Sequence, residues 1–130
     1  MVIGGTQDNG TFLFNDGTWI QTYGGDGMEA FIHHDNPDTM WATNYNGALS
    51  RSYDGGQTYT SSLEQPMTDA GEAGDWVTPF AQHPYFSNEI FAGFENVWKS
   101  TDLGDSWTKI SNLGNKSLTS LAISPTNPGY

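Results

Sequence analysis

The feature that most constrains the fold is a motif that occurs twice. Residues 52–59 read SYDGGQTY and residues 100–107 read STDLGDSW, so both follow the pattern Ser-x-Asp-x-Gly-x-Ser/Thr-aromatic. The two motif aspartates, Asp54 and Asp102, are 48 positions apart. A weaker version, residues 14–19, ends in the same Thr-aromatic pair. Self-similarity at such a spacing is typical of repeat architectures, in which each repeat is one supersecondary unit.

A second landmark repeats out of phase with the first. Residues 32–37 (IHHDNP), 81–86 (AQHPYF) and 122–128 (AISPTNP) each follow a short apolar run and carry proline in a turn. No apolar stripe with a helical period runs beyond one turn, and the 16 glycines suit short strands joined by tight turns. Intervals of about 40–50 residues with four short strands each have the size of β-propeller blades.

The strands of a blade are lettered A to D along the chain. We predict strands B to D of one blade in 1–23, a full blade in 24–63, a full blade in 64–111, and strand A of a further blade in 112–130. The strands are expected at 2–7, 11–14, 18–23, 28–34, 39–45, 48–52, 58–63, 76–82, 89–94, 97–100, 106–110 and 118–123. The apolar residues expected between blades are Phe31, Trp41, Leu49, Phe80, Phe91, Trp98, Leu121 and Ile123.

The repeated motif resembles the Asp box, or BNR repeat, of sialidases, sortilin-type propellers and xyloglucan-cleaving glycoside hydrolases. Residues 5–11, followed by 24–27, resemble a subset of large secreted bacterial proteins with such propellers. The resemblance covers nearly the whole chain and implies an all-β fold: a β-propeller segment of about three four-stranded blades, with Asp-box hairpins joining strands C and D. The structural Asp-box residues would be Ser52, Asp54, Gly56, Tyr59, Ser100, Asp102, Gly104 and Trp107.

The motif residues favour a structural role over a chemical one. Asp54 and Asp102 are placed to accept hydrogen bonds from backbone N–H groups of their own turns. His33 and His83 align at the ends of two strands A, but no His-x-x-x-His or cysteine spacing indicates a metal site. No metal and no cofactor is therefore expected.

Propeller geometry separates the loops into two faces. The C-to-D and A-to-B turns share one face, and the B-to-C and D-to-A loops share the other, where the family binds ligands. Amides and carboxylates bind hydroxyl groups, and aromatic rings stack on sugar rings. The predicted ligand-binding residues on this second face are Gln7, Asp8, Asn9, Asp26, Tyr45, Asp75, Trp76 and Glu95.

These residues favour a secreted or cell-surface propeller, bacterial in origin, that binds a carbohydrate or a protein. The alternative is part of a xyloglucanase-like glycoside hydrolase, in which Asp8 and Asp26 are the candidate catalytic pair, because hydrolysis needs two carboxylates flanking the bond. A sialidase is disfavoured, since its substrate carboxylate needs an arginine cluster and the chain has only Arg51.

Charge and composition exclude several partners. The formal net charge of −11 would repel a phosphate backbone, so nucleic acid is not an expected partner. No run of 18 apolar residues predicts membrane insertion, and no cysteine is present to form a disulfide. The first residues do not read as a signal peptide, so an export signal would lie upstream. Three blades do not close a ring, so a longer chain or self-association is expected to supply the rest.

Overall fold

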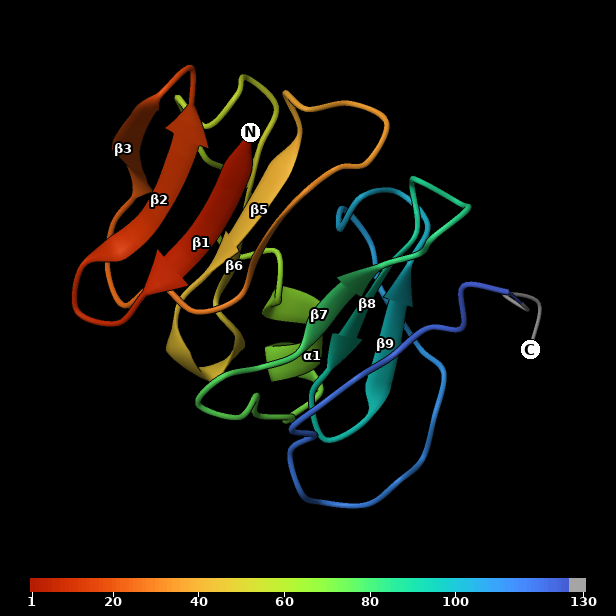
Figure 1. Cartoon of the computed structure of the whole chain (residues 1–130). Coiled ribbons are helices and arrows are strands. Elements are labelled where there is room, and N and C mark those ends of the chain that lie inside the picture. The colour runs from red at the N-terminus through yellow and green to blue at the C-terminus, as the bar shows by residue number, and fades with distance from the viewer. Residues whose placement is uncertain (127–130) are drawn as a thin grey trace.

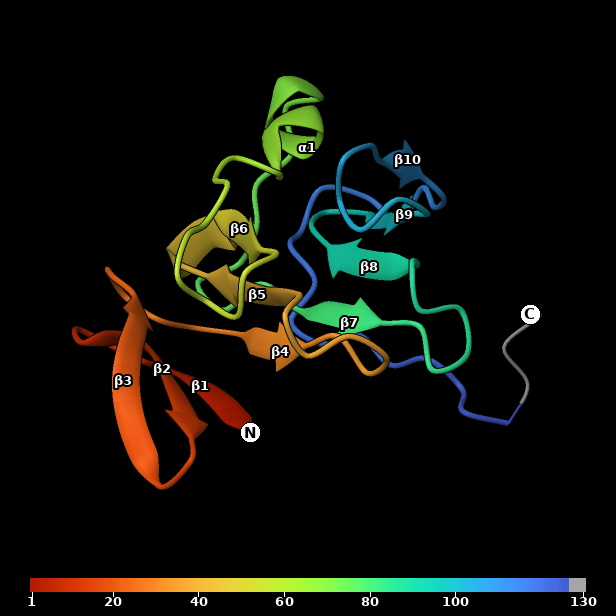
Figure 2. The same ribbon diagram turned by 90° about the horizontal axis from the view of Figure 1, so that it is seen from above.

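The computed structural model describes residues 1–126 and shows three antiparallel sheets that follow one another like the leaves of a fan (Figures 1 and 2). The first sheet contains β1 (Val2–Thr6), β2 (Gly10–Asn15) and β3 (Thr18–Tyr23). The second contains β4 (Ala30–Ile32), β5 (Met40–Thr43) and β6 (Leu49–Ser52). The third contains β7 (Phe80–Gln82), β8 (Ile90–Gly93), β9 (Val97–Ser100) and β10 (Thr108–Lys109). Each sheet is a meander of consecutive strands, so the predicted all-β propeller segment is confirmed.

The structure differs from the expected twelve strands in two places. Residues 58–63 form only an isolated bridge from Thr60 to Arg51, and the positive φ of Ser62 (66°) turns the chain away from the sheet. Residues 118–123 form no strand, because no strand B lies beside them in the described part of the chain. The rest of the predicted segment at 112–130 extends past the described residues.

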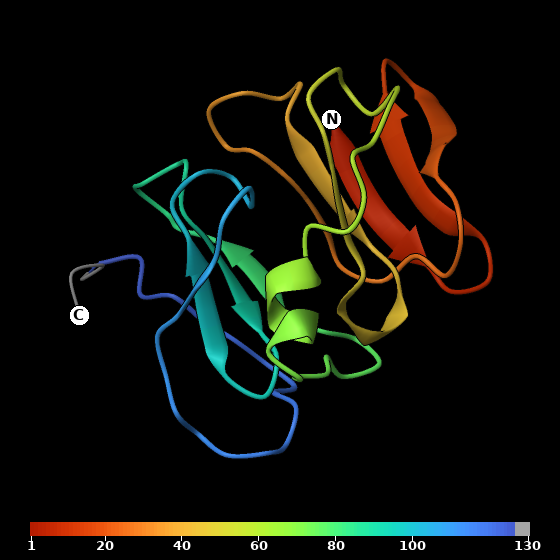
Figure 3. The same ribbon diagram turned by 180° about the vertical axis from the view of Figure 1, so that it is seen from behind.

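One short helix stands where the sequence predicted none. Helix α1 (Gln65–Asp69) has Pro66 in its first turn, where a proline costs no hydrogen bond. It lies at the edge between the second and third sheets (Figure 3). Met67, which is completely buried, holds it there, and five residues are too few to show a helical period in the sequence.

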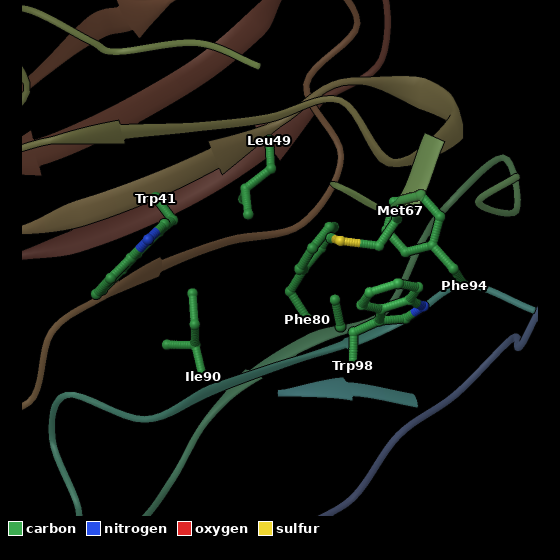
Figure 4. Packing of buried hydrophobic residues seen from close by; sticks show 8 residues of the cluster. Trp41, Leu49, Met67, Phe80, Ile90, Phe94 and Trp98 are labelled. Atoms are coloured by element: carbon green, nitrogen blue, oxygen red, sulfur yellow. The ribbon is translucent and has the colours of Figure 1, made fainter. Parts of the chain in front are cut away.

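The core fills the space between the second and third sheets (Figure 4). Phe31 stacks on Trp41 with ring centroids 4.7 Å apart, and the Trp41 indole N–H donates to the carbonyl of Leu103 at 3.2 Å. Strand alternation directs these side chains to one face, so the predicted packing of Trp41, Leu49, Phe80 and Trp98 between blades is confirmed, while Met67, Ile90 and Phe94 join the same cluster without having been predicted.

The two motif hairpins share one hydrogen-bond pattern. In the first, Asp54 Oδ1 accepts from the Ser52 hydroxyl (2.7 Å) and from the amides of Gln57 (3.0 Å) and Thr58 (2.8 Å). In the second, Asp102 accepts from the Ser100 hydroxyl and from the Ser106 amide and hydroxyl. This bonding supports the structural role, because each carboxylate satisfies N–H groups that no strand would pair.

The weaker motif of the first sheet forms a different turn. Asn15 pairs directly with Thr18, so only Asp16 and Gly17 connect β2 to β3. Both have positive φ, 49° and 80°, as a type I′ hairpin requires. The first sheet therefore lacks the longer motif turn of the other two.

Candidate functional site

Loops of the first and second sheets enclose a shallow depression of about 450 Å³ on the face opposite the motif hairpins. Its walls come from the β1–β2 turn, the end of β3, the β3–β4 loop and the β5–β6 loop. The lining residues are Asp8, Asn9, Gln21, Gly25, Asp26, Asn44 and Tyr45. Five of the seven carry a carboxylate or an amide, and none is basic, so the surface offers many acceptors and some neutral donors.

Backbone contacts hold the first two loops together. The amide of Asp8 donates to Asp26 Oδ1 at 2.9 Å, which ties the β1–β2 turn to the β3–β4 loop. The Gln21 side chain donates to the carbonyl of Asn9 at 2.8 Å. Gly27 lies so close to Gly10 that a Cβ on it would come within 2.1 Å of the Gly10 carbonyl oxygen. Glycine is thus required for this close approach of the two loops.

The floor of the depression contains an acceptor without a donor. Asn44 Oδ1 is buried and accepts no hydrogen bond from residues 1–126. A Cβ on Gly25 would lie 2.8 Å from the Asn44 side chain, so the glycine keeps this amide close to the surface of the loop. A buried polar atom gains free energy from a partner, so Asn44 favours a ligand that donates a hydrogen bond.

Two aromatic rings adjoin the depression. Tyr45 and Trp76 stack with ring centroids 5.2 Å apart and an interplanar angle of 13°. The amide of Asn46 donates to the Trp76 carbonyl at 3.4 Å, which links the loop of the second sheet to the segment before the third. Tyr45 and Trp76 remain 46% and 47% exposed, so the pair forms an apolar platform beside polar groups.

The structure brings together five of the eight predicted ligand-binding residues. Asp8, Asn9, Asp26 and Tyr45 line the depression, and Trp76 adjoins it through Tyr45. The other three lie outside the lining: Gln7, whose carbonyl accepts from Asn9, Asp75, which accepts from the amide of Trp76, and the partly exposed Glu95. Their role in binding stays a prediction.

Sequence reasoning missed Gln21 and Asn44 as site residues. Gln21 lies in β3, opposite Phe12 in the ladder, and only the loops were searched. A strand residue at the end nearest the ligand face can also reach it, and the alternation of β3 would have signalled this. Asn44 sits at the start of a B-to-C loop, where asparagine is equally common as a turn residue.

The buried carboxylate of Glu72 removes the third sheet's loop from the site. It accepts from the amide and side chain of Asn96 (3.0 and 2.8 Å) and from the Trp98 indole (2.9 Å). Burial acts to raise the pKa of Glu72, but these bonds and Lys109 outweigh it, so the pKa lies below its usual value. Asn96 therefore stabilises the fold and is not free for a ligand.

The histidines serve the turns after strands A. His33 Nδ1 accepts from the amides of Asp35 and Asn36, and His83 Nδ1 accepts from those of Tyr85 and Phe86, all at 3.0–3.1 Å. A ring nitrogen that accepts two amides carries no proton and is not open to a metal ion. Burial first, and then the nearby His34, lowers the pKa of His33. Within residues 1–126, no cluster of three or more His, Asp or Glu is placed to hold a metal.

Arg51 is also committed to the fold. Its side chain is 5% exposed and donates to the Leu103 carbonyl (2.8 Å) and to Asp105 (2.7 Å) across the boundary between the second and third sheets. It is thus far from available to a substrate carboxylate, as the sequence argument against a sialidase expects. No helix in residues 1–126 has the length and apolarity to cross a membrane.

Successive antiparallel meanders with their turns on two opposite faces define the chain as a β-propeller segment. The crystal structure of an ancestral GH74 enzyme is similar, with a TM-score of 0.63, 14% identity, and coverage of 97% of this chain but 20% of that one. The structure of YCF48 from Cyanidioschyzon merolae is similar at a TM-score of 0.49 and 17% identity, over 74% of this chain and 31% of that one.

These likenesses show the fold alone. The chain spans about one fifth of the length of the GH74 enzyme. No protein-family model and no curated protein matches the sequence. The propeller resemblance is therefore supported, and the assignment of the motif hairpins to the Asp-box family stays a prediction.

Proposed function

We propose that this chain is part of a secreted or cell-surface β-propeller that binds a neutral carbohydrate in the depression between its first and second blades. The observation that carries the proposal is the convergence of five carboxylate or amide side chains beside the exposed Tyr45–Trp76 pair. A sugar presents hydroxyl groups at its rim and apolar C–H faces, and this surface offers a partner for each.

The charges of the lining select among ligands. Asp8 and Asp26 are both accessible, and no Lys or Arg lies in the lining to neutralise them. A phosphate or sialate would be repelled there, whereas a neutral glycan would not. A cationic protein surface would also be attracted, but the unpartnered Asn44 Oδ1 in a concave floor favours a small hydroxyl donor.

The test is binding of neutral polysaccharides, including xyloglucan, by calorimetry with the 130-residue chain. Trp76→Ala should weaken binding about tenfold, because loss of an aromatic contact costs roughly 1.4 kcal/mol. Trp19→Ala is the matched control, since Trp19 is similarly exposed, at 57%, but lies outside the depression. Equal losses in the two variants, or binding of a basic protein in place of any glycan, would reject the proposal.

A second candidate function is glycoside hydrolysis. Two observations favour it: a GH74 enzyme shares the fold, and Asp8 and Asp26 line one depression. If the protein cleaves a β-glucan, Asp8→Asn and Asp26→Asn should lower turnover about 100-fold or more with binding intact. If both changes weaken binding and no polysaccharide is cleaved, the site is a binding site only.

A further inference from the structure

The first sheet has a free edge that the other two sheets do not have. Within residues 1–126, β1 pairs only with β2. The equivalent strands β5 and β8 pair on their other edge with β4 and β7, the strands A of their blades. The backbone of Val2–Thr6 therefore presents an unused ladder of N–H and C=O groups.

The same sheet leaves an apolar face uncovered. Val2 pairs with Phe14, just as Met40 pairs with Ser52 and Ile90 with Ser100, so these three residues occupy one position in successive blades. Met40 and Ile90 are 0% exposed between blades, but Val2 is 55% exposed. Trp19 lies on the same face, in contact with the ring of Phe14 at 5.1 Å. This surface is thus built like the buried boundary between two blades.

The segment at 118–125 has the sequence and local contacts of a strand A. It reads LTSLAISP, which repeats VTPFAQHP at 77–84. The Ser124 hydroxyl accepts from the amide of Thr126 at 3.4 Å, two residues on, just as His83 accepts from Tyr85. The Leu118 amide donates to the Phe94 carbonyl at 2.8 Å, which places the segment against the third sheet. It pairs with no strand in residues 1–126.

We propose that two copies of this chain close a ring of six blades, in which residues 118–123 of each copy add as strand A to β1 of the other. The register follows from the third sheet, where Gln82 pairs with Ile90. Ile123 corresponds to Gln82 and Val2 to Ile90, so Ile123 of one copy lies opposite Val2 of its partner. The two interfaces are related by a two-fold axis, so the assembly ends at two copies.

Cysteine cross-linking tests the register, because the chain contains no cysteine. The double variant Val2→Cys/Ile123→Cys should give, after mild oxidation, one species of twice the 14.2 kDa chain mass on a non-reducing gel. The control Thr6→Cys/Ile123→Cys places the first thiol on the same face but about 13 Å farther along β1, beyond the reach of a disulfide. It should remain uncross-linked.

Three results would overturn the proposal. Equal cross-linking of both double variants would reject the register, and a ladder of higher species would reject the closed pair. Sedimentation equilibrium of the unmodified chain needs no variant, and there a monomer at micromolar concentration would reject association itself. A dimer in this measurement, together with the selective cross-link, is the expected outcome.

Discussion

Replacing Asp102 with alanine tests the structural role of the motif aspartates. Asp102 Oδ1 accepts from the Ser100 hydroxyl at 2.7 Å and from the Ser106 amide at 2.8 Å, and Oδ2 accepts from the Ser106 hydroxyl at 2.6 Å. Water replaces the carboxylate at the exposed Ser106, but Ser100 is 1% exposed, and its hydroxyl loses its acceptor. One buried donor without a partner costs about 1–3 kcal/mol, which is the expected loss of unfolding free energy.

Urea denaturation followed by tryptophan fluorescence measures this loss. Asp38→Ala is the matched control, because it removes the same charge from an exposed turn whose carboxylate accepts no hydrogen bond from residues 1–126. Its unfolding free energy should change by less than about 0.5 kcal/mol. An equal change in both variants, or a loss of glycan binding by Asp102→Ala at unchanged stability, would refute the reasoning.

Three further predictions concern stability. Glu72→Ala leaves the Trp98 indole and the Asn96 amide without an acceptor and should cost about 2–4 kcal/mol in urea denaturation, with a smaller loss for Glu72→Gln. Arg51→Lys keeps the charge but loses one of two bonds across the blade boundary, which should cost about 1–2 kcal/mol. Bonds led by the Thr58 hydroxyl lower the pKa of Asp54 from 3.8 to about 2, so its contribution is complete above pH 3.8 and is lost as the pH falls to 2. Circular dichroism at decreasing pH should show Asp54→Asn and the wild type converging over this interval.

The fold was predictable because its strongest signals are local. A Ser-x-Asp-x-Gly turn specifies its own hydrogen bonds within a few residues, so two copies identify two hairpins and the repeat spacing identifies the blades. The elements that were missed depend on distant contacts. Helix α1 exists because Met67 fits the gap between two sheets, and the strand expected at 58–63 is lost because Ser62 turns the chain outward.

The candidate site was predictable in part for a similar reason. Strand alternation along a meander places every second connection on one face, so Asp8, Asp26 and Tyr45 were assigned to the ligand face without coordinates. Which of these loops meet depends on how neighbouring blades pack. The close approach of Gly27 to Gly10 joins the first two loops, whereas Glu72 draws Asn96 into the interior. The sequence shows neither contact in advance.

The blade boundaries themselves bear on the proposed assembly. Arg51 of the second sheet reaches the motif turn of the third sheet at Leu103 and Asp105. The register places Lys99 at the same position in the third sheet, since Lys99 pairs with Phe91 as Arg51 pairs with Trp41. Lys99 instead pairs with Glu89 of its own sheet at 2.9 Å, so it requires no turn from a following blade.

The first sheet is the blade that offers no such turn. Its two-residue connection at Asp16 and Gly17 is too short to reach across a boundary as the motif turn of the third sheet does. A third sheet whose lysine is satisfied internally and a first sheet with a short hairpin are therefore compatible neighbours. This match between the two exposed ends of one chain is what the pairing of two copies would join, and replacing the short hairpin with a motif turn should weaken the dimer.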